Sequence, residues 1–78
     1  MATVTVRYFA QLRERRGLDA EPVEVPAGTT VRALYDQIFP PDQGQVPVSY
    51  ARNAATAAAD EVLEDGDEVV FIPPIGGG

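Results

Sequence analysis

The last eight residues of this sequence are the ones whose types and spacing most clearly suggest chemistry. They read Phe-Ile-Pro-Pro-Ile-Gly-Gly-Gly and end at Gly78. Because two consecutive prolines cannot join a sheet ladder, they would project the last four residues away from the body. Gly76 and Gly77 have no Cβ atom and could thread a narrow slot, leaving the Gly78 carboxylate for an enzyme to enclose and activate with ATP. The alternative is a frayed end or a leftover of cloning, since terminal glycines are common and mobile.

The rest of the composition limits the kinds of reactive site that the chain could contain. The chain has 78 residues with no cysteine and no histidine, which excludes thiol nucleophiles, disulfides, Cys/His zinc sites, iron–sulfur clusters and imidazole catalysis. We therefore expect no metal site. A chain of this length can build one modest core, so a small domain is more plausible than an enzyme with its own pocket.

The charge of the chain and its targeting signals indicate which partners and which cell compartment to expect. Six basic residues against twelve acidic ones give a net charge of −6, which disfavours nucleic acid as a partner. All six basic residues are arginine, so no side-chain amine can be acylated, although a GC-rich genome would give the same bias. The sequence shows neither a signal peptide nor an apolar run long enough to span a membrane. We expect a cytoplasmic protein without a membrane partner.

The first part of the chain predicts two strands and two helices. Residues 3–9 alternate between apolar and polar and should form a half-buried strand. Phe9 interrupts the polar face, so it either covers an edge or is exposed at a contact surface. A short helix is expected over residues 10–16, a second strand over 22–26, and the main helix over 31–39. The main helix has apolar residues at i, i+3, i+4 and i+7, a capping Thr29 or Thr30 before it, and two prolines after it.

The second part predicts the remaining strands. Residues 46–52 alternate and suggest a third strand. Residues 53–60 are ambiguous between a helix and a hairpin with a short edge strand, although Asn53 could supply a turn. An Asp-Gly turn leads into residues 68–72, which are almost all apolar, as in a central strand covered on both faces.

The order of these elements predicts an α+β fold of the β-grasp type. The sheet would be mixed, with four to five strands, one main helix and one short helix. Its first and last strands would be parallel neighbours at the centre. We expect a single domain over residues 1–75 and a flexible glycine tail over 76–78.

Three segments resemble the small subunit of molybdopterin synthase, a family of MoaD-like, ubiquitin-like sulfur carriers. They are Val-Arg-Tyr-Phe-Ala-Gln-Leu-Arg-Glu at residues 6–14 with Gly17, Asp-Gly-Asp-Glu-Val at 65–69, and the ending at 71–78. Together they run from near the start of the chain to its last residue. The sequence departs from the family at residues 52–55, where Arg-Asn-Ala-Ala replaces a Val-Asn-Gly-like hairpin.

The resemblance implies a reaction sequence in which this chain is a co-substrate rather than an enzyme. A ubiquitin-activating-type adenylating enzyme would consume ATP to activate the Gly78 carboxylate, and a sulfur donor protein would convert it to a thiocarboxylate. Docked in the large subunit, the tail would donate sulfur to a pterin precursor to build the molybdopterin dithiolene of the molybdenum cofactor. Gly76 and Gly77 would thread the slot. The catalytic residues would lie in the large subunit, and this chain would bind no cofactor.

The resemblance also implies a hydrophobic surface beside the tail that docks both partners. By position, the residues assigned to it are Phe9, Phe71, Ile72, Pro74 and Ile75, with Arg13 as a polar contact. Alternation turns one of Phe71 and Ile72 inward, so either could be ordinary core. Phe9 is the better candidate because the rest of its strand face is Thr and Arg, whereas Arg13 could equally be a solvated helix charge.

Three other functions remain open. The chain could carry sulfur to thiamine or another metabolite, but the segments at residues 9–14 and 71–74 favour molybdopterin. It could be a ubiquitin-like modifier conjugated through Gly78, although without lysine it could not form Lys-linked chains on itself. It could also be a β-grasp binding module with an inert tail.

Overall fold

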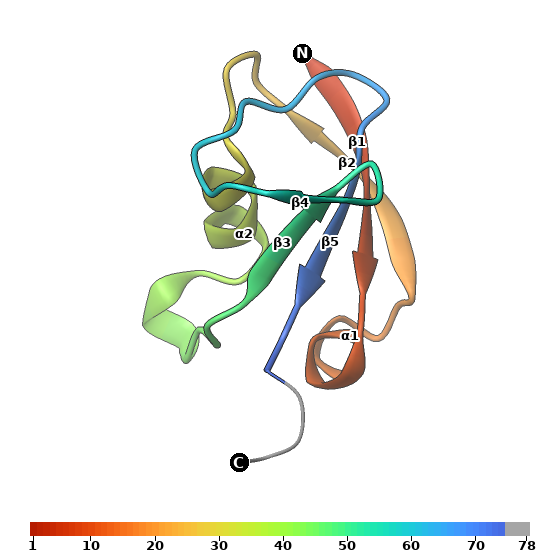
Figure 1. Ribbon diagram of the computed structural model, residues 1–78. Coiled ribbons are helices and arrows are strands. Elements are labelled where there is room, and N and C mark those ends of the chain that lie inside the picture. Colours follow the sequence, from red (N-terminus) through yellow and green to blue (C-terminus); the bar gives the residue numbers. More distant parts are fainter. Residues whose placement is uncertain (75–78) are drawn as a thin grey trace.

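A computed structural model describes residues 1–74 and shows a five-stranded mixed sheet with two α-helices (Figure 1). In chain order the elements are β1 (Ala2–Tyr8), α1 (Ala10–Arg16), β2 (Ala20–Val25), α2 (Val31–Ile38), the 3-10 turn η1 (Pro41–Gln43), β3 (Ser49–Arg52), β4 (Ala55–Ala57) and β5 (Glu68–Ile72). The strand order is β2-β1-β5-β3-β4. β1 and β5 are parallel and the other neighbours are antiparallel, which confirms the β-grasp arrangement. The predicted glycine tail lies outside the described residues.

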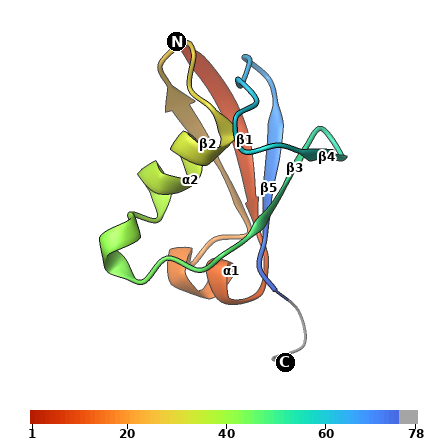
Figure 2. The same ribbon diagram turned by 60° about the vertical axis from the view of Figure 1, so that its left-hand side comes forward.

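The core lies between one face of the sheet and α2. Figure 2 shows α2 across that face, with α1 on the same side near the ends of β1 and β5. β1 alternates as predicted, with its even-numbered residues buried. Leu12 is buried from α1, and α2 buries Val31, Leu34 and Tyr35. Thr30, rather than Thr29, caps α2, because its side chain accepts a hydrogen bond of 3.1 Å from the Ala33 N–H.

The prediction that β5 is covered on both faces is wrong. Val69 and Phe71 are buried, whereas Val70 is only half-buried and Ile72 is exposed. The reason is that both helices lie on one side of the sheet, so the other face of β5 meets solvent (Figure 2). The apolar side chains on that outer face are therefore available for contact.

Residues 53–60 contain a hairpin and a short edge strand, which settles the ambiguity left by the sequence. Arg52 pairs with Ala55 across a two-residue turn. Both turn residues have positive φ, 51° at Asn53 and 68° at Ala54, as tight hairpin turns require. β3 begins at Ser49 rather than at residue 46, and Pro47, just before it, has no N–H to give to a ladder.

Replacing Ala54 with glycine should stabilise the fold. Alanine rarely adopts a φ of 68°, whereas glycine does so freely, and we expect the free energy of unfolding to rise by about 0.5–1 kcal/mol. The matched control is Ala55→Gly one residue later, inside β4, where glycine should instead lower stability by a similar amount. Chemical denaturation of both variants measures the difference, and a loss of stability in Ala54→Gly would contradict the argument.

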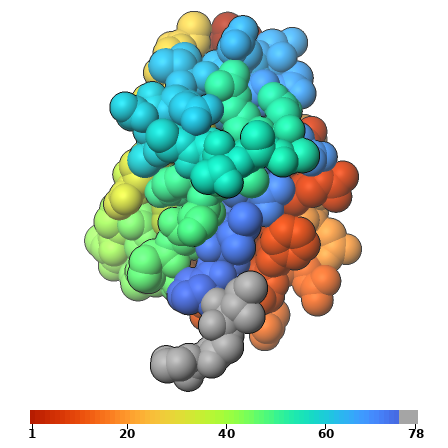
Figure 3. Space-filling model, in the orientation of Figure 1, coloured from red at the N-terminus to blue at the C-terminus, as the bar shows by residue number. Residues whose placement is uncertain are grey.

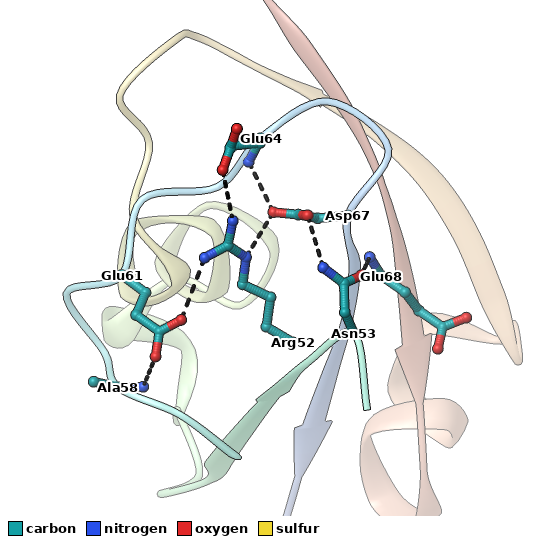
Figure 4. A network of polar contacts seen from close by, with 7 residues as sticks. All are labelled: Arg52, Asn53, Ala58, Glu61, Glu64, Asp67 and Glu68. Carbon is teal, nitrogen blue, oxygen red and sulfur yellow. Dashed lines mark hydrogen bonds and ion pairs between the residues drawn. The ribbon is translucent and has the colours of Figure 1, made fainter. Parts of the chain in front are cut away.

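A polar network holds the end of the sheet at the β3–β4 turn (Figure 4). The Arg52 guanidinium donates from Nε to Asp67 at 2.7 Å, and from its two Nη atoms to Glu61 and Glu64 at 3.3 Å each. Asn53 donates to Asp67 at 2.9 Å and accepts from the Glu68 N–H at 2.9 Å. Because the network ties the hairpin to the loop before β5, it explains why a turn without glycine still forms.

Asp67 lies at the centre of this network, where its burial and its hydrogen bonds change its pKa in opposite directions. Burial alone would raise the pKa of the Asp67 carboxyl group, but hydrogen bonds from the Glu64 N–H, Asn53 and Arg52 outweigh it. The pKa is therefore held below its usual value, and the group stays ionised.

Candidate functional site

The candidate site is the end of the molecule where β5 finishes and the tail begins. Ile72, the last residue of β5, pairs with Ser49 of β3. Pro73 is then buried and Pro74 is exposed. In Figure 3 the blue end of β5 reaches the surface between the green segment before β3 and the orange-red segment of β1 and α1. The root of the tail is thus fixed on two sides, while Ile75, Gly76, Gly77 and Gly78 lie outside the described residues.

Phe9 and Ile72 each follow directly after a buried residue of the central strands. Tyr8 and Phe71 form the last pair of the parallel β1–β5 ladder, and alternation along an extended chain directs the side chains that follow them toward the opposite face. Phe9 is 51% exposed and Ile72 is 36% exposed. The predicted exposure of Phe9 is confirmed.

The assignment of Phe71 to the docking surface is wrong. Its side chain is fully buried, at 0% exposure. Its ring packs against Tyr35 of α2 at a centroid distance of 4.8 Å, and against Tyr50 of β3 at 6.1 Å. Of the two candidates in β5, Phe71 is the core residue and Ile72 the surface one, because the helices lie on the face to which Phe71 points.

An open apolar hollow adjoins the tail root. It has a volume of about 530 Å³ and is lined by Pro47, Val48, Ser49, Ile72, Pro73 and Pro74. Sequence reasoning identified Ile72 and Pro74 but missed Pro73 and the segment 47–49. No local pattern could have identified that segment, because only the β3–β5 register brings it to the tail root.

Arg13 is an exposed residue of α1. Its Nη1 donates to Asp19 at 3.3 Å, and its side chain remains 58% exposed. The guanidinium is thus available for a partner, and its predicted role as a polar contact stays a prediction.

A second polar cluster fixes α1, and with it the position of Phe9. The Tyr8 hydroxyl donates to Glu21 at 2.6 Å, and Arg16 donates to the same carboxylate oxygen at 2.6 and 2.9 Å. Burial, and then the hydrogen bond to Glu21, raise the pKa of Tyr8, so its hydroxyl remains a donor. The Phe9 carbonyl accepts from the Leu12 N–H at 3.0 Å. Hydrogen bonds of the Tyr8 side chain and of the Phe9 carbonyl therefore stabilise the turn from β1 into α1.

The described residues at this end of the molecule form an exposed apolar surface. Within residues 1–74, no three acidic side chains are grouped so that they could hold a metal ion. No helix in the same range is long and apolar enough to cross a membrane. What the site offers is an apolar face around the root of a glycine-ended segment. We call this face, defined by Phe9, Ile72 and Pro74 together with the hollow, the tail-root surface.

Several known proteins are similar to this chain in sequence and fold. Residues 6–78 match the sequence profile of the ThiS family. The chain is 41% identical to the molybdopterin synthase sulfur carrier subunit of Mycobacterium tuberculosis, over 100% of both chains. A Pyrococcus furiosus structure, assigned as molybdopterin converting factor subunit 1, has a TM-score of 0.82 at 32% identity, covering 96% of this chain and 100% of that one. The small archaeal modifier protein 1 of Haloferax volcanii has a TM-score of 0.81 at 26% identity, with the same coverage.

Proposed function

Because this chain belongs to the ThiS family, we propose that it is the sulfur carrier subunit of a molybdopterin synthase. The observation that supports this most strongly is the 41% identity to the Mycobacterium tuberculosis sulfur carrier subunit over the full length of both chains. The glycine ending of the sequence supplies the carboxylate that such a carrier needs. A thiocarboxylate at Gly78 would also carry sulfur in a chain that has no cysteine.

The proposed reaction leaves catalysis to other proteins. An adenylating enzyme of the ubiquitin-activating type consumes ATP and forms an acyl adenylate at Gly78, and a sulfur donor protein replaces AMP to give the thiocarboxylate. The large subunit of the synthase, which holds the catalytic residues, then uses this sulfur to build the dithiolene of molybdopterin. These steps take place in the cytoplasm, and this chain binds no cofactor itself.

In this proposal the tail-root surface docks the partners. Phe9 and Ile72 offer exposed apolar side chains, and the hollow beside Pro74 can receive an apolar side chain of the large subunit. Arg13 would add a polar contact at the rim. Docking here would direct the three glycines into the partner's slot, because the surface surrounds the point where the tail leaves β5.

Protein modification is the second candidate function. It is favoured by the likeness to the small archaeal modifier protein 1 of Haloferax volcanii. In that role Gly78 would be joined to lysines of other proteins, and this lysine-free chain could not be a lysine acceptor itself. A carrier for thiamine or another sulfur metabolite would share the activation chemistry and differ only in the final acceptor.

Mass spectrometry after activation tests the proposal. The chain is incubated with ATP, a sulfur source and the cognate adenylating enzyme, and we expect one oxygen of Gly78 to be replaced by sulfur. Trypsin helps to locate the change, because Arg52 is the last basic residue and the peptide 53–78 excludes Met1, whose oxidation gives nearly the same mass increase. An unmodified peptide with a competent enzyme would contradict the carrier function. Lysine isopeptides of Gly78 in cell extract would favour the modifier.

The variant Gly77→Ala tests the threading role in the same assay. An added Cβ atom should obstruct a slot shaped for glycine, so we expect at least a tenfold slower activation. The thermal midpoint should change by less than about 1 °C, because a residue beyond the last strand contributes little to the core. Activation at the normal rate would refute threading. The matched control is Ala59→Gly, an exposed position far from the tail in sequence, which should leave activation unchanged.

A further inference from the structure

One buried side chain, Tyr35 of α2, contacts the chain just before each of the two segments that line the hollow. Its ring packs against Phe71 at a centroid distance of 4.8 Å, and residues 72–74 follow Phe71. Its hydroxyl donates a hydrogen bond to the Val46 carbonyl, and residues 47–49 follow Val46. We call residues 47–49 and 72–74 the lining segments, because together they line the hollow. Tyr35 thus joins both lining segments to the core.

The chain between α2 and β3 depends on such contacts, because it has little regular structure of its own. Its one regular element is the short turn η1, and Figures 1 and 2 show it as the light green loop that joins α2 to β3. Gln45 is held by hydrogen bonds to Asp36 at 2.7 Å and to the Phe39 carbonyl at 2.9 Å. Ser49 is held in the ladder opposite Ile72.

Between these two fixed points, residues 46–48 have a single polar tie. In the part of the chain that the structure describes, the hydrogen bond from Tyr35 is the one that joins residues 46–48 to the rest of the fold. Val48 adds a partly buried side chain against the core, whereas Pro47 is exposed. The position of this lining segment therefore depends on the Tyr35 hydroxyl.

The Tyr35 hydroxyl is itself fixed by packing. The residue is only 1% exposed, and its ring also contacts Phe39 at a centroid distance of 5.5 Å and Tyr50 at 6.2 Å. A ring enclosed on several sides has one orientation open to it. Burial raises the pKa of Tyr35 above its ordinary value, so the hydroxyl remains a donor at neutral pH.

We propose that Tyr35 is a positioning residue that fixes the spacing of the two lining segments before the large subunit docks. The inference rests on the proposed function, in which the hollow receives an apolar side chain of that subunit. A hollow shaped in advance spares the complex the entropy of ordering residues 46–48. Without the hydroxyl, only a fraction of the free chains would hold the docking shape, and the apparent affinity would fall by that fraction.

The variant Tyr35→Phe tests the inference, because it removes the hydroxyl and keeps the ring that packs against Phe71. The matched control is Tyr50→Phe, which removes a hydroxyl from the same aromatic cluster. Within residues 1–74 that hydroxyl makes no hydrogen bond to residues 46–48. Backbone amide relaxation is measured on the free full-length chains, and titration calorimetry gives their affinity for the large subunit, at a temperature where every variant is folded.

We expect a local loss of order and a loss of affinity in Tyr35→Phe alone. The order parameters of Val46 and Val48 should be about 0.85 in wild type and Tyr50→Phe, as in rigid backbone, and should fall toward about 0.6 in Tyr35→Phe. The dissociation constant should rise at least about fivefold in Tyr35→Phe and stay within about twofold of wild type in Tyr50→Phe. A merely structural role would lower stability without changing the affinity of the folded chain.

Unchanged order parameters at Val46 and Val48, or a dissociation constant of Tyr35→Phe within about twofold of wild type, would overturn the inference and leave the proposed function intact. Failure of wild type to bind the large subunit would instead contradict the proposed docking, and with it this inference, before any variant is measured. The mass change at Gly78 tests sulfur loading separately from both results.

Discussion

Replacing Phe71 with alanine should lower the free energy of unfolding by about 3–5 kcal/mol, the range typical of a fully buried aromatic residue. Phe71 lies in the central strand, is 0% exposed and packs against Tyr35 and Tyr50. A domain of this size has a total stability of only about 5–10 kcal/mol, so the variant should lose from about a third of that stability to all of it. Urea denaturation followed by circular dichroism measures the loss.

Phe9→Ala provides the matched comparison, because it removes the same side chain from an exposed position. We expect its free energy of unfolding to fall by less than about 1 kcal/mol, the range of ordinary surface substitutions. Its affinity for the large subunit should fall at least tenfold, since exposed aromatic residues dominate many interfaces. Titration calorimetry with the large subunit measures this. A loss of roughly 3 kcal/mol or more of stability in Phe9→Ala would instead place Phe9 in the core and remove it from the tail-root surface.

Replacing Asp67 with alanine should lower the free energy of unfolding by about 3 kcal/mol. The change removes the carboxylate that accepts from Arg52, Asn53 and the Glu64 N–H. Buried donors that lose their acceptor account for losses of this size. The control Asp60→Ala removes an exposed carboxylate from the same acidic segment and should change stability by less than about 0.5 kcal/mol. Similar effects of the two variants would show that the network contributes little.

The same residue makes stability depend on pH in a defined direction. Although burial by itself would raise it, the pKa of Asp67 in the folded protein lies below its usual value because of its hydrogen bonds. The unfolded chain has the ordinary value of about 3.9, so the stabilisation is complete above that pH and is lost as the pH falls toward the folded pKa. Wild type should therefore lose stability more steeply than Asp67→Asn as the pH falls below about 4. Parallel acid dependence of the two proteins would rule out Asp67 as the source.

Local patterns in the sequence were sufficient to predict most of the strands and helices. Alternation located β1, the i, i+3, i+4, i+7 spacing located α2, and Asn53 marked a turn that the structure confirms. Family membership also followed from local segments, and the comparisons bear it out. Such features are encoded within a few residues, because strand and helix periods and turn preferences are properties of the chain itself.

The tertiary structure decided which side chains form the surface around the tail. The period of two in β5 requires that Phe71 and Ile72 point to opposite faces, but not which of them is covered; that depends on the side of the sheet against which α2 packs. In the same way, only the antiparallel register of β3 and β5 places Ser49 beside the tail root. Pairing and packing join residues far apart in the chain, and a local pattern does not encode them. The sequence by itself therefore determined most of the elements and the glycine ending that we propose to be reactive, whereas the packing of helices and strands decided what surrounds the root of that ending.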